Sequence, residues 1–429
     1  MFGFAIDLFY RRRLISGEVP SDRPVLLVVN HPNGLVDPAV VMRTVSRTVS
    51  FLAKEPLFRM PIVGSWLRGV GALPVYRKRD GADTAQNKGA LHAAQGLLEE
   101  GGLVCLFPEG TSHSGPSLEP LKTGAARLAL STVQAGTTNL AIIPMGLIYR
   151  NKSQYRGEVG TIVGTPIDIE ASMLLSKADP KHAVQLLTEQ ITQGLREATV
   201  NLRSWDDQPL LELAGAVWQA HRSETGTADP LATLAQFAKE REKLDETQRA
   251  ELQLLRQSLV SLKSRLQAVG LEVSHLHRRY QMSHVARFVG RNLMAFFVGL
   301  PIALLGTVTY AIPYYGVRPF LYLMKPTDDL EATAKILISF VLFPLWQLIL
   351  TVFLFQFISP IAAILSFFLL PFAGVYTHQF LAGRKAAFAE IQTLLTLPFQ
   401  RRIREQLKAE CRSIATAIES ATRPINSVR

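Results

Sequence analysis

Residues 25–38 read VLLVVNHPNGLVDP, and this stretch decides the fold that the sequence predicts. The apolar run Val25–Val29 predicts a strand that is buried on both faces, as in a mixed or parallel sheet. The asparagines, proline and glycine that follow predict a turn. A helical pattern begins after Asp37, which would be the N-cap, with Pro38 at the first helical position. The stretch therefore predicts a strand–turn–helix unit.

His31 lies in the predicted turn, at the carboxyl end of the strand, where open α/β sheets bind their ligands. Asp37 follows about one helical turn later. A carboxylate that accepts a hydrogen bond from one ring nitrogen fixes the tautomer, and the other nitrogen can then take a proton. The alternative is a structural turn histidine beside an aspartate that only caps the helix. The pair taken alone leaves both interpretations open.

Three further blocks follow in order. Residues 71–77 read GALPVYR, residues 106–112 read LFPEGTS and are followed by LKTGA at 121–125, and residues 141–146 read AIIPMG. Together with the first block, they resemble the glycerophospholipid acyltransferase family, whose members acylate glycerol-3-phosphate and lysophosphatidate. The resemblance covers roughly residues 20–170. The family's usual first block has four residues between histidine and aspartate, whereas this chain has five; this longer form resembles the fungal-type branch that acylates glycerol-3-phosphate or dihydroxyacetone phosphate.

The resemblance implies acyl transfer from a thioester to a hydroxyl, by direct attack and without an acyl-enzyme. His31 would be the general base and Asp37 its orienting partner. Arg77 and Lys122 would contact the phosphate of the acceptor, and Glu109 would belong to the acceptor site, on glycerol hydroxyls or on Arg77. Backbone amides and hydroxyls would add an anion cradle at Gly110, Thr111 and Ser112. The structural alternatives are a solvated strand-end arginine, a surface lysine and a turn glutamate.

Composition narrows the class of protein further. The chain has 429 residues, 48% of them hydrophobic, and long apolar runs in the last third indicate a membrane protein. Its net charge of +11 fits anionic lipid headgroups and phosphorylated substrates, and no basic, aromatic-interleaved motif for nucleic acid occurs. Two cysteines, Cys105 and Cys411, give neither a disulfide framework nor a metal-ligand spacing. We therefore expect no metal. The resemblance implies no cofactor either, with acyl-CoA or acyl carrier protein as the co-substrate.

The predicted fold is an α/β acyltransferase domain, a mixed sheet flanked by helices, followed by a helical region and C-terminal transmembrane helices. The expected divisions are a membrane-interface anchor at 1–19, the acyltransferase domain at 20–205, a helical region at 206–285, a membrane region at 286–382 and a basic helical tail at 383–429. The alternative for residues 1–10 is a first helix packed on the domain. Predicted strands are Val25–Val29, Val49–Ala53, Gly71–Tyr76, Leu103–Phe107, Ala141–Tyr149 and Glu158–Val163, and predicted helices are Pro38–Arg47, Asp83–Glu100 and Lys122–Gln134.

A heptad-like seam of apolar residues runs from Leu252 to Tyr280. It would suit a coiled coil that joins two copies of the chain, so a homodimer through 252–280 is one expectation. An intramolecular helical hairpin is the preferred alternative, because Gly270 interrupts the seam.

The last third predicts a multi-pass membrane protein. Ile336–Tyr376 suits two crossings joined at Ser359-Pro360. Basic residues on both sides place the catalytic domain and the tail in the cytoplasm, which requires an even number of crossings. The uncharged span from Asn292 would then contribute none or two, as a hairpin broken at Pro301 and Pro313.

The expected function is therefore membrane-bound transfer of an acyl group to glycerol-3-phosphate, with lysophosphatidate or dihydroxyacetone phosphate as the alternative acceptors. The expected partners are an acyl thioester, a glycerol phosphate or lysophospholipid, and anionic membrane lipids. Two rival hypotheses are a non-catalytic membrane scaffold or transporter that retains the domain, and a hydrolase that uses the same His–Asp pair on water.

Overall fold

The computed structural model describes residues 2–76, 87–222, 234, 246–277, 282–396 and 401–422. Two sequence-predicted positions, Arg77 and Tyr280, lie outside these ranges. Contacts divide the chain into two compact units. Unit 1 is Met1–Glu212, Asp229–Asp245 and Asp328–Thr333, and unit 2 is Leu213–Ala228, Glu246–Thr327 and Ala334–Arg429.

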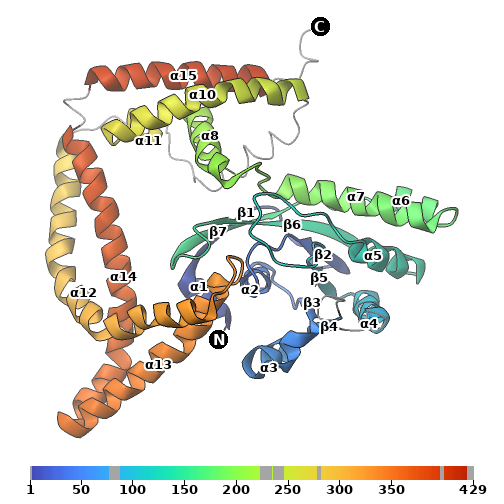
Figure 1. The fold of residues 1–429 in the computed structure, drawn as a ribbon, viewed down its shortest axis with the longest axis horizontal. Helices are drawn as coiled ribbons and strands as arrows, with labels where there is room; N and C mark the ends of the chain where they lie inside the picture. The colour runs from blue at the N-terminus through green and yellow to red at the C-terminus, as the bar shows by residue number, and fades with distance from the viewer. Residues whose placement is uncertain are drawn as a thin grey trace. The chain divides into compact units, whose positions relative to one another are not determined.

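Among the described residues of unit 1, seven strands form one sheet in the order β1-β7-β6-β2-β5-β3-β4 (Figure 1). The pairing is parallel throughout, except that β6 and β7 are antiparallel. The predicted mixed sheet is thus confirmed. The strands are β1 (Tyr10–Ser16), β2 (Val25–Val29), β3 (Ser50–Lys54), β4 (Leu73–Val75), β5 (Leu103–Leu106), β6 (Ala141–Arg150) and β7 (Gly157–Val163).

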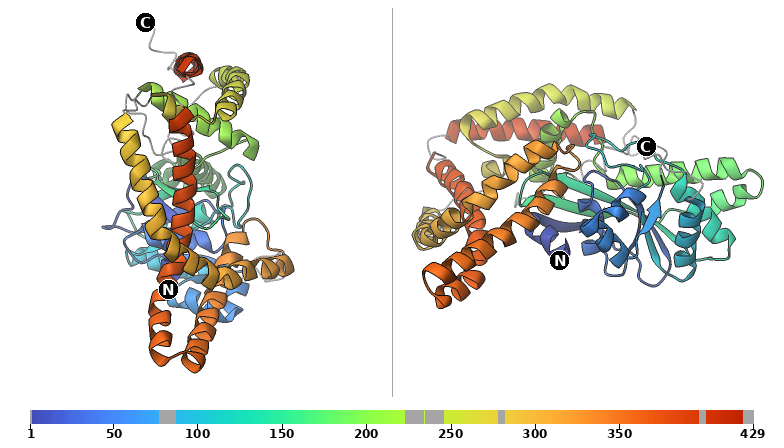
Figure 2. Two further views of the ribbon diagram at one scale, coloured as in Figure 1. Left: turned by 90° about the vertical axis from the view of Figure 1, so that its left-hand side faces the viewer. Right: turned by 60° about the horizontal axis from the view of Figure 1, so that its bottom comes forward.

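Strand β2 lies at the centre of the sheet, and all five of its residues are buried. Leu26 and Val28 belong to a core cluster with residues of α4, α5 and α7, so these helices cover one face. Helices α1 and α2 lie on the opposite face (Figures 1 and 2). The helices of unit 1 are α1 (Phe2–Phe9), α2 (Val36–Thr44), α3 (Pro61–Gly69), α4 (Asn87–Glu99), α5 (Gly124–Gln134), α6 (Glu170–Ser176) and α7 (Pro180–Ala198), with 3-10 turns at Glu55–Arg59 and Trp205–Asp207.

The N-terminal residues are part of the domain. Ile6 is fully buried, Tyr10 is 1% exposed, and helix α1 packs on α2. Arg11, Arg12 and Arg13 lie in β1, which pairs with β7 at one edge of the sheet. Arg12 pairs with Asp7 of α1 at 2.6 Å. This matches the alternative of a packed first helix, and strand β1 was not predicted.

Unit 2 contains the apolar helices. Helix α12 (Met282–Met324), α13 (Glu331–Phe357, whose first three residues belong to unit 1) and α14 (Pro360–Thr396) include the three segments that are long and apolar enough to cross a membrane among the described residues. The predicted break at Ser359 is confirmed. The predicted hairpin within 292–323 is wrong, because α12 is one continuous helix with Pro301, Pro313 and Pro319 inside it. Proline bends a long apolar helix without ending it when the freed carbonyls find other partners, and Figure 1 shows α12 bent.

Helices α12 and α14 pack closely because glycines lie where they meet. A β-carbon on Gly306 would lie 2.8 Å from the carbonyl carbon of Ala373, and one on Gly374 would lie 2.8 Å from the Tyr310 ring. Thr377 Oγ1 lies 2.8 Å from the carbonyl oxygen of Ala373 on its own helix and 3.2 Å from that of Ala303 on α12, so its proton can be shared between the two. Small residues and such hydrogen bonds are the usual means of helix association in a bilayer.

The described part of the seam includes five buried residues, namely Leu259, Leu262, Leu266, Val273 and Leu276. Helix α10 (Glu246–Val269) ends at Gly270, which has φ +65°, and α11 (Val273–His277) follows. Leu262 and Leu266 are buried where α10 packs on α15 (Arg401–Thr422), and Arg404 donates to the carbonyl of Leu276. This contact is intramolecular but involves the C-terminal tail, so the predicted helical hairpin and the homodimer through 252–280 both stay predictions. Unit 2 also holds most of α8 (Gln208–Arg222).

Candidate active site

The turn after β2 is fixed to the neighbouring strand β6. Asn30 exchanges two hydrogen bonds with the backbone of Leu147, at 3.1 and 2.7 Å. Gly34 has φ +39°, and the amides of Val36 and Asp37 donate to the carbonyl of Asn33. This tight turn absorbs the extra residue of the His-x5-Asp spacing. It sets His31 and Asp37 side by side.

His31 Nδ1 lies 2.8 Å from Asp37 Oδ2. A carboxylate can only accept, so Nδ1 carries the proton and Nε2 presents a lone pair. Among the described residues, no hydrogen bond occupies Nε2. The ring stacks on Phe107 with centroids 4.1 Å apart, and the side chain stays 17% exposed. The pair therefore has the geometry of an oriented, accessible base.

Asp37 does not cap the helix, contrary to the sequence prediction. Helix α2 begins at Val36, its N-cap is Leu35, and no side chain caps it. The Asp37 carboxylate is fully buried instead and accepts three hydrogen bonds. The donors are His31, the Asn33 amide at 2.7 Å and the Tyr149 hydroxyl at 2.6 Å. Three donors from different parts of the turn and from β6 hold the carboxylate in one orientation.

A second buried carboxylate, that of Glu109, holds the backbone of the same turn. Its Oε1 accepts from the amide of His31 at 2.7 Å, and its Oε2 contacts His113 Nε2 and the amide of Glu119. The amide of His113 in turn donates to the carbonyl of His31. The hydrogen bond to Glu109 raises the pKa of His113, against the opposing effect of burial. Glu109 thus links the third block to the first, and its predicted contact with an acceptor stays a prediction.

The predicted anion cradle is a tight turn over which Lys122 lies. Gly110 has φ +73°, and a β-carbon built there would lie 2.8 Å from Cδ and Cε of Lys122. Ser112 donates to Asp329 at 2.5 Å, within unit 1. The ammonium of Lys152 reaches the carbonyl of Pro32 at 3.1 Å and the hydroxyl of Ser114. Burial lowers the pKa of Lys152, while nearby carboxylates, Asp37 first, oppose this.

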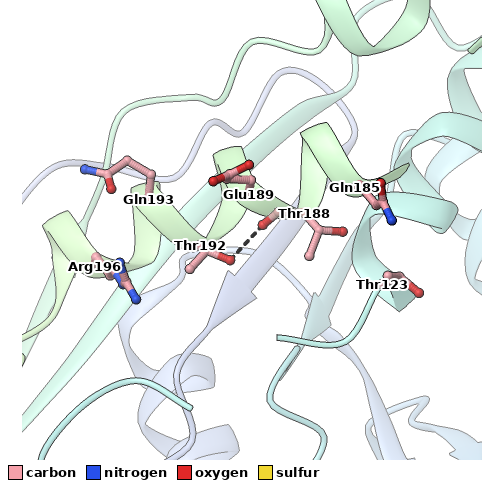
Figure 3. Close-up of a pocket in the computed structure, with 7 residues that line it drawn as sticks. All are labelled: Thr123, Gln185, Thr188, Glu189, Thr192, Gln193 and Arg196. Carbon is pink, nitrogen blue, oxygen red and sulfur yellow. Dashed lines mark hydrogen bonds between the residues drawn. The ribbon is translucent and has the colours of Figure 1, made fainter. Parts of the chain in front are cut away.

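Two of the cavities among the described residues of unit 1 differ in size and in lining. The larger, about 380 Å³, runs along α7 between polar side chains, and Figure 3 shows the threonines, glutamines, Glu189 and Arg196 that line it. None of the sequence-predicted site residues lines it. The smaller, about 210 Å³, is mainly apolar and borders the motifs through Pro32, Glu109, His113 and Lys152. Proximity to the His–Asp turn makes the smaller cavity the relevant one.

The structure brings together all the sequence-predicted site residues that it describes: His31 with Asp37 and Glu109, and Gly110 with Lys122, in the loop that continues through Thr111 and Ser112. Arg77 lies outside the described residues. Sequence reasoning missed Tyr10, Asn33, His113, Tyr149 and Lys152. The one available signal was position, because Tyr149 ends the predicted strand Ala141–Tyr149 and Lys152 follows it closely.

The mixed sheet places an oriented histidine after its central strand, and Glu109 joins this turn to the later blocks. Residues 13–148 match the model of the family described as Acyltransferase. Residues 13–148 of this chain therefore resemble an acyltransferase domain.

Individual relatives match over parts of their length. Glycerol-3-phosphate O-acyltransferase 2 of Saccharomyces cerevisiae is 34% identical over 28% of this chain and 17% of its own. The 1-acyl-sn-glycerol-3-phosphate acyltransferase of Borreliella burgdorferi is 29% identical over 42% of this chain and 69% of its own. The crystal structure of the Thermotoga maritima acyltransferase PlsC matches 45% of this chain and 76% of that one, with 22% identity and a TM-score of 0.33. This chain thus spans less than a fifth of the yeast relative.

Proposed function

We propose that this protein is a membrane-bound O-acyltransferase that moves a fatty acyl group from an acyl thioester to a hydroxyl of glycerol-3-phosphate. The observation that carries the proposal is the His31–Asp37 pair, in which a buried carboxylate orients a histidine whose Nε2 is left accessible. The yeast relative is named for the same acceptor. Relatives named for 1-acylglycerol-3-phosphate make lysophosphatidate the second candidate.

In the proposed reaction, Nε2 of His31 takes the hydroxyl proton as the oxygen attacks the thioester carbonyl. A carbon–oxygen bond forms, the carbon–sulfur bond breaks, and the imidazolium returns its proton to the departing thiolate. Asp37 stabilises the imidazolium in the interval. Arg77, Lys122 and the loop at 110–112 would bind the acceptor phosphate.

The candidate membrane helices support a location in the membrane, close to lipid-soluble acyl chains. We further propose that the acyltransferase domain faces the cytoplasm, where acyl thioesters and glycerol phosphates are present. The described structure holds three helices that could cross. If all three cross the membrane, the acyltransferase domain and the tail after α14 lie on opposite sides of it. A single cysteine placed in the tail, in a background without Cys105 and Cys411, can be tested with a membrane-impermeant thiol reagent. Its labelling shows on which side of the membrane the tail lies.

The test of the function is release of free thiol from acyl-CoA by the purified, detergent-solubilised full chain. Release should depend on added acceptor, with glycerol-3-phosphate ahead of lysophosphatidate and dihydroxyacetone phosphate. A preference for lysophosphatidate would select the second candidate. Thiol release without any acceptor would indicate a hydrolase. No release from either acyl-CoA or acyl-acyl carrier protein, with or without acceptor, would indicate a non-catalytic scaffold.

A further inference from the structure

Strand β6 supplies a third member to the His31–Asp37 pair. The Tyr149 hydroxyl donates to Asp37 Oδ1 at 2.6 Å, while the other carboxylate oxygen, Oδ2, receives His31 Nδ1 and the amide of Asn33. Both oxygens are therefore held, from two different elements of the fold. Because Met145 of β6 pairs with Val29, the last residue of β2, the strand continues beyond β2 and carries Tyr149 to the turn.

We propose that Tyr149 is a positioning residue, which fixes the Asp37 carboxylate and thereby sets how strongly His31 holds a proton. The inference rests on the proposed function, in which His31 is the base. Tyr149 does not need to touch a substrate for this role. It acts through Asp37 alone.

Tyr149 keeps its hydroxyl proton and can therefore always donate it to Asp37. Burial, and then the charge of Asp37, raise the pKa of Tyr149 well above its ordinary value of 10.0. A hydrogen bond from a neutral hydroxyl draws negative charge on Asp37 away from His31. Without it, the carboxylate stabilises the imidazolium more strongly, so His31 keeps its proton to higher pH and less of it is available as a base.

Other ionisable groups around the pair come from several elements and would be unchanged by removing the hydroxyl. They are Tyr10 of β1, Cys105 of β5, Glu109 and His113 of the loop after β5, Lys152 after β6, and Asp328, Asp329 and Glu331 of the segment at 328–333.

Tyr10 is the matched control. It is 1% exposed, and its ring lies edge-on to that of Tyr149 with centroids 5.6 Å apart. Its hydroxyl accepts from Asn33 Nδ2 at 2.9 Å and donates to the carbonyl of Lys152. It makes no hydrogen bond to Asp37 among the described residues. Tyr10→Phe therefore removes a buried hydroxyl from the same network without changing the donors to Asp37.

The test is a ring-carbon NMR titration of His31 in the full chain, with the signal assigned by its loss in His31→Ala. In Tyr149→Phe the titration midpoint should move to higher pH by about half a unit, roughly a threefold change in proton affinity. Tyr10→Phe should leave the midpoint in place. The acid limb of the pH profile of kcat/KM should move with the midpoint. An unmoved midpoint in folded Tyr149→Phe, or an equal move in Tyr10→Phe, would overturn the proposal.

A second substitution covers a Tyr149→Phe that does not fold. Placing 3-fluorotyrosine at position 149 makes the hydroxyl a stronger donor and should move the midpoint to lower pH; no move, or a move upward, contradicts the proposal. The titration needs no turnover, so failure of the acyltransferase assay and failure of this inference are separate results.

Discussion

The two units use apolar residues in opposite ways. In the acyltransferase unit, the side chains of β2 are covered by its own helices, and even Asp37 and Glu109 are buried because each accepts several hydrogen bonds. In the helices of unit 2, Leu345 is 51% exposed and Phe357 is 75% exposed. Only 11% of the most apolar window of α13 is buried. The buried polar groups of the first unit are therefore satisfied by internal hydrogen bonds, whereas the apolar surface of the second unit needs lipid to cover it.

The largest effect on activity is expected from neutralising the buried carboxylate of Asp37. Asp37→Asn leaves the imidazole of His31 without a fixed tautomer, so kcat for acyl transfer should fall by about 10²–10⁴-fold. Asp7→Asn is the control. Asp7 of α1 pairs with Arg12 and Arg43, and its side chain is 31% exposed whereas that of Asp37 is fully buried. Steady-state kinetics on folded protein provide the measurement, and equal losses in both variants would remove Asp37 from the site.

Replacing Gly110 tests the anion cradle. Gly110→Ala adds a β-carbon at φ +73° and pushes Lys122 away, so the KM for the acceptor should rise about tenfold while that for acyl-CoA changes less. Gly101→Ala is the matched control. Gly101 also has a positive φ, +81°, but a β-carbon there meets nothing within 4 Å. A rise in acceptor KM shared by the two variants would mean that backbone strain, not Lys122, is responsible.

The membrane unit should respond to a change in the packing of its helices. Gly306→Leu forces α12 and α14 apart and should destabilise the protein by about 1–3 kcal/mol. Gly290→Leu, on the same helix with open space around it, should cost far less. Thermal unfolding in one detergent compares them directly. Matching midpoints for the two variants would show that the α12–α14 contact does not stabilise the fold.

The smallest expected effect is a pH dependence from His113. Its pKa is raised above the ordinary 6.5 by Glu109, so the stabilisation is complete below about pH 6.5 and is lost as the pH rises through the raised pKa. Wild type should therefore exceed His113→Gln in unfolding temperature at pH 6, and the difference should shrink toward pH 9. A difference that grows with pH would contradict the assignment of the His113–Glu109 pair.

Local patterns predicted the centre of the fold well. The run at 25–29 is β2 with the same limits, and the predicted helices and strands of the acyltransferase domain appear within a few residues. The sequence does not predict strand β1, because Arg11, Arg12 and Arg13 resemble a solvated or headgroup-binding run. An edge strand, however, needs only backbone pairing and one buried face. Helix α12 was read as broken because prolines are strong breakers in water, while a long apolar helix accommodates them.

The site was predictable only where its chemistry is local. His31 and Asp37 are six residues apart and could be paired from the sequence, although the role of Asp37 as a cap was wrong. Tyr149 is 112 residues from Asp37, and no periodicity reports a contact that exists only because β6 lies beside β2. The contacts that hold a site in place come from sheet order, which a single sequence does not state.

The central claim is that His31 is the base of an acceptor-dependent acyl transfer, and one comparison tests it most directly. Thiol release from acyl-CoA is measured with and without glycerol-3-phosphate for wild type and His31→Ala, at equal amounts of folded protein. Wild type should release thiol only when acceptor is present, and His31→Ala should release it about 10²–10⁴-fold or more slowly. Retention of most of the acceptor-dependent activity by His31→Ala would contradict it.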